Sequence, residues 1–207
     1  MAPSYGMNKK PTESTIQYYE QDPEGFWQGT KDHDVSQNYQ SLLNNISTEA
    51  PYQILDFGCG PGRDLKYFSD LGHKVVGLDG SASFCKMAHE YSGCEVLNQD
   101  FISLDLPRSF FDGIFANASL FHVPKAELPR VLREFHLSLK EQGVLFSSNP
   151  RGSEEMMNGL RYANYMQVDE YKELVEQTGF ELRDHYFRPN DVPVEQAPWL
   201  ACVFIKK

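Results

Sequence analysis

The chain has 207 residues, of which 41% are hydrophobic, enough for the core of one α/β domain with an N-terminal extension. It has no apolar run near the roughly 20 residues that a membrane span needs and no apolar signal-peptide core at its start, so we expect a cytoplasmic protein that binds no membrane. The formal net charge of -10 disfavours nucleic acid as a partner and favours a small-molecule substrate, because binding phosphates requires clustered cations.

Residues 1–48 predict a helical extension, with two helical stretches within 14–46 that are broken at 22–25 and at Gly29. The stretch between Tyr18 and Trp27 is aromatic and acidic, as expected of a lid that folds over a ligand. Aromatic rings attract a nearby cation by about 0.5–2 kcal/mol, so Tyr19 and Trp27 are candidates for cofactor contact. Hydrophobic docking of an amphipathic helix explains each ring equally well.

Residues 49–207 predict one domain in which strands and helices alternate, a pattern typical of a parallel sheet with crossover helices. The predicted fold is therefore α/β and Rossmann-like, with a seven-stranded, mostly parallel sheet. Helices are expected at 63–71, 81–91, 125–139 and 168–179, and strands at 53–57, 74–78, 95–98, 111–117, 144–148, 180–187 and 199–206.

Three glycines, Gly58, Gly60 and Gly62, fall within five residues directly after the first predicted strand. A turn of this kind lets a backbone approach a ligand more closely than any Cβ would permit, and its amides form an electropositive cradle. Cys59 is expected to supply only a backbone amide to this turn. Arg63 occupies the third glycine position of the dinucleotide fingerprint, which disfavours a nicotinamide cofactor.

Acidic residues end the next two strands. Asp79 follows the second strand, where a carboxylate can accept hydrogen bonds from both hydroxyls of a ribose, and Gly80 and Ser81 continue into the same rim. Asp100 and Phe101 follow the third strand, and the alternative role for Asp100 is to cap a helix or turn. Because ligands bind at the carboxyl ends of strands in such sheets, these residues predict a nucleoside site.

The pattern D-x-G-x-G-x-G, led by Asp56, resembles motif I of the class I S-adenosylmethionine (SAM) methyltransferases, and Asp56 and Arg63 are candidates for cofactor contact. The resemblance implies SAM as cofactor, S-adenosylhomocysteine as its product, and an antiparallel C-terminal hairpin in the strand order 3-2-1-4-5-7-6. It implies that Asp100 and the amide of Phe101 hold the adenine. It also implies that Asn117, at the end of the fourth strand, lies near the sulfonium and the methionine tail.

Further polar residues follow the fourth and fifth predicted strands on the same rim. A lone histidine such as His122 is often structural, so its position is compatible with either role. An arginine in the loop after the fifth strand could hold a substrate carboxylate bidentately, or lie on the surface. The candidates for contact with an acceptor are Tyr18, His122, Asn149, Arg151, Arg161 and Tyr162.

Five segments resemble a narrower group, the methyltransferase domain at the C-terminus of ovothiol synthases (5-histidylcysteine sulfoxide synthases) and its stand-alone versions. This resemblance implies N-methylation of the imidazole of 5-thiohistidine to give ovothiol A. The segments are 32–38, 58–64, 115–124, 146–152 and 195–201.

Three other readings remain open from the residues: a methyltransferase for another small acceptor (a carboxylate, thiol or chalcogen oxyanion), a nicotinamide-dependent oxidoreductase, and a SAM-binding module without catalysis. The four cysteines form no C-x-x-C pair, so we predict free thiols and no metal site. The sequence is compatible with a monomer or a homodimer.

Overall fold

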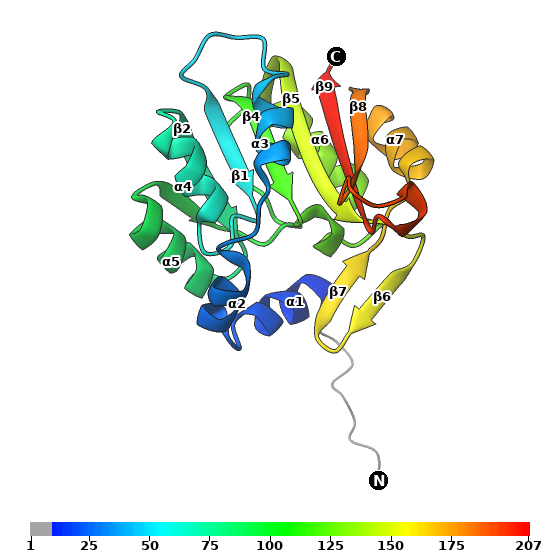
Figure 1. Ribbon diagram of the computed structural model, residues 1–207. Helices are drawn as coiled ribbons and strands as arrows, with labels where there is room; N and C mark the ends of the chain where they lie inside the picture. Colours follow the sequence, from blue (N-terminus) through cyan, green and yellow to red (C-terminus); the bar gives the residue numbers. More distant parts are fainter. Residues whose placement is uncertain (1–9) are drawn as a thin grey trace.

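The structure is a computed structural model that describes residues 10–207; residues 1–9 of the predicted extension lie outside the described part. Its centre is a seven-stranded sheet in the order β3-β2-β1-β4-β5-β9-β8 (Figure 1). With the separate pair β6 and β7 set aside, this is the predicted strand order. The predicted α/β Rossmann-like fold is therefore confirmed.

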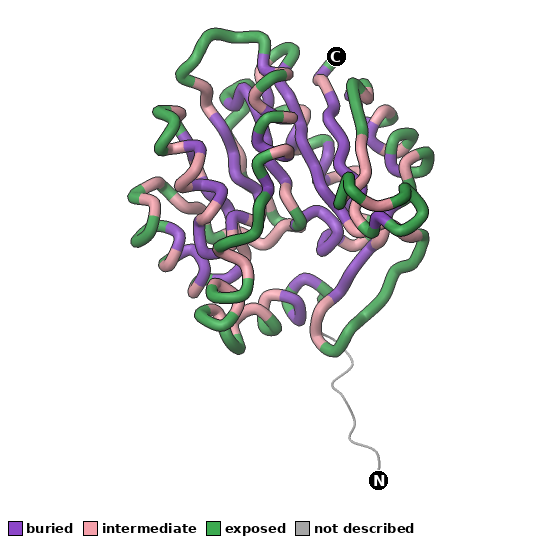
Figure 2. The backbone as a smooth tube through the Cα atoms, viewed as in Figure 1, coloured by how far each residue is buried: buried purple, intermediate pink, exposed green. Residues whose placement is uncertain are grey.

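The strands of the sheet run parallel except for β9, which lies antiparallel between β5 and β8. The central strands are apolar and buried on both faces, as parallel strands covered by helices must be (Figure 2). The strands are β1 (Gln53–Phe57), β2 (Lys74–Asp79), β3 (Glu95–Asn98), β4 (Phe111–Asn117), β5 (Leu139–Pro150), β8 (Phe180–Arg188) and β9 (Trp199–Lys206).

Helices cover both faces of the sheet (Figure 1). Helices α4 (Arg63–Asp70) and α5 (Ala82–Ser92) pack on one face, where Leu65 and Phe68 contribute to a buried cluster. Helices α6 (Leu128–Ser138) and α7 (Val168–Glu176) cover the other face.

The N-terminal extension forms three helices where two were predicted: α1 (Pro11–Tyr19), α2 (Pro23–Thr30) and α3 (Ser36–Leu43). Proline stands at the start of α1 and of α2, where its missing N–H and fixed φ suit the first helical turn. Helix α3 packs on the sheet, while α1 and α2 lie beyond the carboxyl ends of the central strands (Figure 1).

A hairpin of β6 (Glu155–Asn158) and β7 (Arg161–Asn164) stands where the sequence predicted a loop. It packs against α1, and the Tyr162 amide donates a hydrogen bond of 2.9 Å to the Thr15 hydroxyl. The hairpin therefore supports α1 over the edge of the sheet. No helix in residues 10–207 is long and apolar enough to cross a membrane.

Candidate functional site

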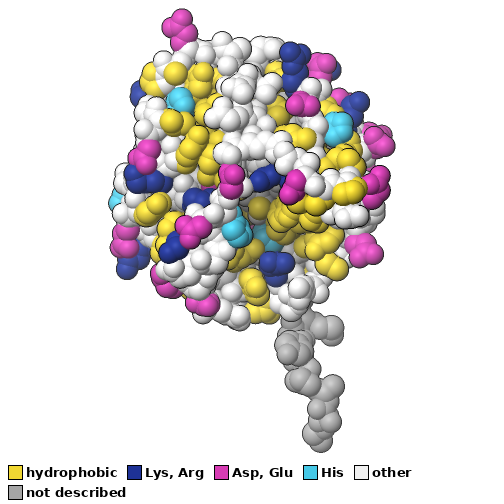
Figure 3. Space-filling view, in the orientation of Figure 1, with side chains coloured by type: hydrophobic (Ala, Val, Ile, Leu, Met, Phe, Trp, Pro, Cys, Tyr) yellow, Lys and Arg dark blue, Asp and Glu magenta, His cyan; other side chains and the backbone are white. Residues whose placement is uncertain are grey.

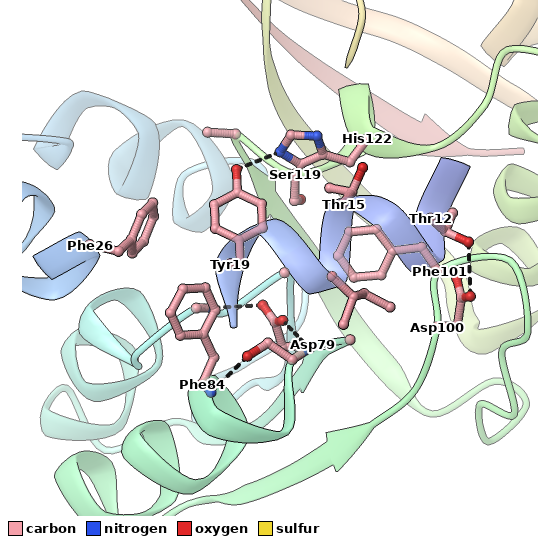
Figure 4. Close-up of a pocket in the computed structure, with 16 residues that line it drawn as sticks. Thr12, Thr15, Tyr19, Phe26, Asp79, Phe84, Asp100, Phe101, Ser119 and His122 are labelled. Atoms are coloured by element: carbon pink, nitrogen blue, oxygen red, sulfur yellow. Dashed lines mark hydrogen bonds between the residues drawn. The ribbon is translucent and has the colours of Figure 1, made fainter. Parts of the chain in front are cut away.

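A first cavity of about 580 Å³ opens at the carboxyl ends of β1, β2 and β3 (Figure 4). The glycine turn after β1 and the rim after β2 line it, and Ile16 and Tyr19 of α1 close it from the other side. Besides Gly58, Gly60 and Tyr19, five predicted cofactor residues line this cavity: Asp79, Gly80, Ser81, Asp100 and Phe101.

The glycine turn presents bare backbone to the cavity. Gly58, Gly60 and Gly62 have φ values of 75°, 52° and 100°, in the left-handed region that favours glycine. A Cβ on Gly58 would lie 2.3 Å from the Cβ of Ser119, so this glycine is required by packing. A Cβ on Gly60 would meet only the Phe26 ring, at 3.7 Å, in a space that both cavities share. A side chain at position 60 would therefore fill cavity space that is open in this protein.

Backbone amides hold the Asp79 carboxylate in place. Its two oxygens accept hydrogen bonds from Gly60 N (3.0 Å) and Ser81 N (2.9 Å). Enclosure by protein raises the pKa of this carboxyl to about 6, in spite of the stabilising amides. A fixed carboxylate beside a bare glycine turn fits the ribose and amino-acid parts of SAM.

Cofactor affinity should increase as pH rises through the pKa of Asp79, about 6, because the ionised carboxylate is the better acceptor for hydroxyl groups. The effect of pH on the stability of the free protein has the opposite sign. Because the folded protein raises this pKa and so favours the neutral carboxyl, the contribution of Asp79 to the free energy of unfolding falls as the pH rises from about 4 to about 6. Calorimetric titration with S-adenosylhomocysteine at pH 5 to 8 measures the effect, and Asp79→Asn, which cannot titrate, is the control. A flat wild-type profile would contradict it.

His122 orients Tyr19. It ends a short 3₁₀ turn after β4, and its Nδ1 lies 2.7 Å from the Tyr162 carbonyl, which can only accept, so Nδ1 carries the proton. Burial lowers the pKa of His122 to about 4, so the ring is neutral and Nε2 accepts from the Tyr19 hydroxyl at 2.8 Å (Figure 4). Both ring nitrogens are occupied, and the ring is poorly suited to taking a proton.

An aromatic wall surrounds the Tyr19 ring. The rings of Phe26 and Phe84 lie 5.4 Å and 5.6 Å from it, centre to centre. Burial raises the pKa of Tyr19 to about 12, so the hydroxyl stays neutral. This wall offers π faces and one neutral hydroxyl, a suitable surface for a sulfonium.

Polar contacts fasten α1 over the first cavity. The Thr12 hydroxyl donates to Asp100 at 2.9 Å, so the carboxylate expected at the adenine is already partly used. Glu20 accepts from the Ser81 hydroxyl at 2.7 Å and from Ser83 at the start of α5. Sequence reasoning missed Glu20, although a carboxylate is favoured at a helix N-terminus.

A second cavity, of about 1500 Å³, adjoins the first and shares Phe26, Gly58, Gly60 and Ala118 with it. It extends toward the ends of β5, β9 and β8 and the loop before α3. Figure 3 shows a hollow in this face of the molecule with charged side chains of both signs around it. Further lining residues are Trp27, His33, Asp34, Val35, Cys59, Arg63, Asn117, Ser148, Arg188 and Trp199.

Hydrogen bonds fix the inner wall of the second cavity. Arg63 donates to both oxygens of Asp64, at 2.7 Å and 3.1 Å, and to the Thr30 carbonyl at 2.8 Å. The Asn117 amide donates to Asp64 at 3.1 Å and accepts from Asn38 at 2.9 Å. Both ends of the Asn117 side chain are therefore occupied, and Arg63 connects the glycine turn to the end of α2.

Four of the predicted contacts lie away from the cavities. Asp56 is buried beneath the glycine turn, where burial and then Asp64 raise its pKa well above the ordinary value. Tyr18 is 39% exposed, with the Arg161 guanidinium 5.6 Å from its ring. The side chain of Tyr162 bonds to Glu155, and only its backbone reaches His122 and Thr15. None of these side chains lines either cavity.

The predicted substrate contacts Asn149 and Arg151 need correction. Asn149 is 0% exposed and follows the alternation of β5, so it shares the face of Ser147 and Tyr171 and turns away from both cavities. Arg151 lies over the Phe187 ring at 4.2 Å and donates to the Ala197 carbonyl at 3.0 Å. Arg151 therefore braces the loop between β8 and β9.

A family model described as a methyltransferase domain matches residues 54–143 of this chain. An uncharacterised methyltransferase of Geobacillus sp. strain WCH70 is 25% identical over 181 residues, covering 78% of this chain and 84% of the relative. One of Oceanobacillus iheyensis is 24% identical over 112 residues, about half of each chain (54% and 53%). The family match at 54–143 runs from β1 into β5. The parts of β5, β8 and β9 that line the second cavity therefore lie outside this match.

Two solved structures share the fold across nearly the whole chain. The 1,6-didemethyltoxoflavin-N1-methyltransferase of Burkholderia thailandensis, solved with 1,6-didemethyltoxoflavin and S-adenosylhomocysteine bound, is 21% identical with a TM-score of 0.77. The alignment covers 100% of this chain and 94% of that one. A SAM-dependent methyltransferase of Leishmania major is 16% identical with a TM-score of 0.79, covering 99% and 87%.

Proposed function

Since the chain is a methyltransferase that uses SAM, we propose that the first cavity holds this cofactor and that the second holds a small-molecule acceptor. The proposed acceptor is the imidazole ring of 5-thiohistidine, and the proposed product is ovothiol A. The two cavities lie at the carboxyl ends of the central strands, where the strand order reverses between β1 and β4. Ligands of doubly wound sheets bind at this position.

One observation carries the choice of acceptor: the five segments that resemble the ovothiol group all meet at the second cavity. Val35, Ala118, Ser148 and Trp199 come from four of them, and the glycine turn is the fifth. These residues are far apart in sequence, so their convergence on one cavity supports a common role in binding the acceptor.

The residues of the first cavity have the chemistry to hold the cofactor. Asp79 would accept the ribose hydroxyls, and the bare backbone at Gly60 would leave room for the methionine tail. Asp100 and Phe101 would hold the adenine, with the Asp100 carboxylate shared with Thr12. When bound, SAM supplies a methyl group activated by its sulfonium and leaves as S-adenosylhomocysteine.

The protein's task is then alignment and exclusion of water, not strong base catalysis. An imidazole is largely neutral at neutral pH, so its nitrogen has a lone pair without assistance. This agrees with the state of His122, which is neutral and bonded at both nitrogens. His122 acts as a positioning residue that holds the Tyr19 side chain of α1 in the wall of the first cavity.

We expect methylation at a ring nitrogen of 5-thiohistidine and not at sulfur. The thiolate is the more reactive atom in solution, so nitrogen selectivity requires the ring to be held with nitrogen toward the methyl group. Plain histidine lacks the sulfur contact, and a site built around a polar group can reject an analogue without it by roughly 10⁴-fold. Incubation with SAM, followed by fragmentation mass spectrometry and carbon–proton NMR, locates the methyl group.

Histidine and 5-(methylthio)histidine are the control acceptors in that experiment. Exclusive S-methylation, or no reaction beside good turnover of another metabolite, would overturn the proposed acceptor. The second result would still leave a SAM-dependent methyltransferase for a different small molecule.

A further inference from the structure

Arg188 places a cation on the outer wall of the second cavity. It ends β8, directly opposite Trp199 of β9, and both side chains line the cavity. One guanidinium nitrogen donates to the Asp34 carbonyl at 2.7 Å, which fixes the direction of the side chain. Arginine carries five N–H donors, so this single bond leaves most of the guanidinium for a ligand.

The Arg63 guanidinium, a second cation of this cavity, is already paired within the protein. The Arg63 guanidinium pairs with Asp64, whose oxygens also accept from Tyr39 and Asn117. The Asp34 carboxylate accepts from the Ser36 amide at the start of α3, and this bond, with a smaller effect of Arg188, lowers the pKa of Asp34. Within residues 10–207, no acidic side chain lies within 4.0 Å of the Arg188 guanidinium.

The position of Arg188 separates it from the cofactor residues. The first cavity is built on β1, β2 and β3, whereas Arg188, Trp199 and Ser148 come from β8, β9 and β5 at the other end of the sheet. A ligand that reaches Arg188 from the shared Gly60 region must pass along the second cavity. Under the proposed function, the ligand that fills this cavity is the acceptor.

We propose that Arg188 binds a carboxylate of the acceptor, so that the enzyme selects acceptors that carry a carboxylate a few bonds from the methylated ring. This inference rests on the proposed function, because it requires that the second cavity holds the acceptor. Guanidinium and carboxylate can pair through two parallel hydrogen bonds, which orient the ligand as well as attract it. A lysine would keep the charge and lose the orientation.

Matched acid and amide acceptors test this proposal. The panel contains 5-thiohistidine, histidine, imidazole-4-acetate and imidazole-4-propionate, each with its carboxamide. For the wild type we expect kcat/KM to favour the acid over the amide by roughly 10- to 100-fold, as for loss of a charge-assisted hydrogen bond. In Arg188→Gln the ratio should fall to about one, and in Arg188→Lys it should be intermediate.

Two measurements separate this role from a structural one. Arg183→Gln, on the same strand and outside both cavities, should keep the wild-type ratio. The Kd for S-adenosylhomocysteine should be unchanged in Arg188→Gln. A weaker Kd with an unchanged acid-to-amide ratio would assign Arg188 to the cofactor and overturn the proposal.

The proposal and the proposed acceptor can fail separately. If 5-thiohistidine is inert but another acid of the panel shows an Arg188-dependent preference, the acceptor is wrong and the carboxylate site stands. Calorimetry of the S-adenosylhomocysteine complex with each acid covers the case without turnover. If no acid binds the wild type, or if acids and amides bind equally, the carboxylate site is overturned.

Discussion

Replacing Gly60 by valine should abolish binding of S-adenosylhomocysteine while the protein stays folded. A Cβ at this position meets only the Phe26 ring, at 3.7 Å, so the free protein can accommodate the side chain. The branched side chain would then fill space that both cavities share and that the methionine tail needs. The left-handed backbone, with φ of 52°, costs the variant about 1–2 kcal/mol of stability.

Gly93→Val is the matched control for that experiment. Gly93 also has a left-handed φ, 73°, and a Cβ there would meet nothing within 4 Å. It ends α5 and lines neither cavity, so its substitution should cost similar stability and leave ligand affinity unchanged. Calorimetry and thermal unfolding of both variants separate strain from loss of the site. Normal affinity in Gly60→Val would remove the glycine turn from the cofactor site.

Replacing Asp79 by alanine should weaken S-adenosylhomocysteine binding by about 1.5–3 kcal/mol, roughly 10- to 150-fold, the usual cost of losing a charged hydrogen-bond acceptor. The variant also leaves the Gly60 and Ser81 amides without their carboxylate partner. Removing an enclosed charge offsets part of that cost to folding, because the pKa of Asp79 is raised. Calorimetry measures the affinity, with a melting curve to show that the variant is folded.

Asp70→Ala is the control for Asp79→Ala. Asp70 ends α4, pairs with Lys66 on the surface and lines neither cavity. Its removal should leave the affinity unchanged. Equal affinity of Asp79→Ala and wild type would place the ribose elsewhere.

The sheet could be predicted because its strands carry strong signals: apolar runs, glycine turns and alternation with helices. The N-terminal helix α1 was harder, because Thr12, Ser14 and Thr15 are polar in sequence yet buried in the fold. The Ser14 and Thr15 hydroxyls donate to the Pro11 carbonyl within the helix. The Thr12 hydroxyl donates to Asp100, 88 positions away, and the Thr15 hydroxyl accepts from the β6–β7 hairpin, 147 positions away. Only tertiary contacts make these residues part of the interior.

The hairpin itself had a local signal that was missed. Gly159 and Leu160 form the two-residue turn between the paired residues Asn158 and Arg161, and Gly159 has a φ of 62°, the left-handed value that such turns favour in their first residue. The polar residues on either side of this turn suggested a substrate loop instead. The misplacement of Asn149 has a similar cause: once β5 extends to Pro150, alternation sends Ser148 and Asn149 to opposite faces.

The residues around the glycine turn could be placed from local sequence, because motif and strand end lie close together in the chain. Arg188 could not, since its role depends on the register of β8 with β9 and on a loop 154 positions earlier. Glu20 is similar, because its partners at the start of α5 are 61 and 63 positions away. Such residues become visible only when the fold brings their neighbours together.

The two cavities draw most of their walls from different stretches of the chain. Apart from the α1–α2 roof, the first depends on residues 58–122, and the outer part of the second depends on residues 148–199. Mutation in the later stretch can therefore alter what enters the second cavity while the earlier stretch is inherited unchanged. A lineage built on this fold can acquire new substrates by drift at the ends of β5, β8 and β9 without having to evolve its nucleoside site again.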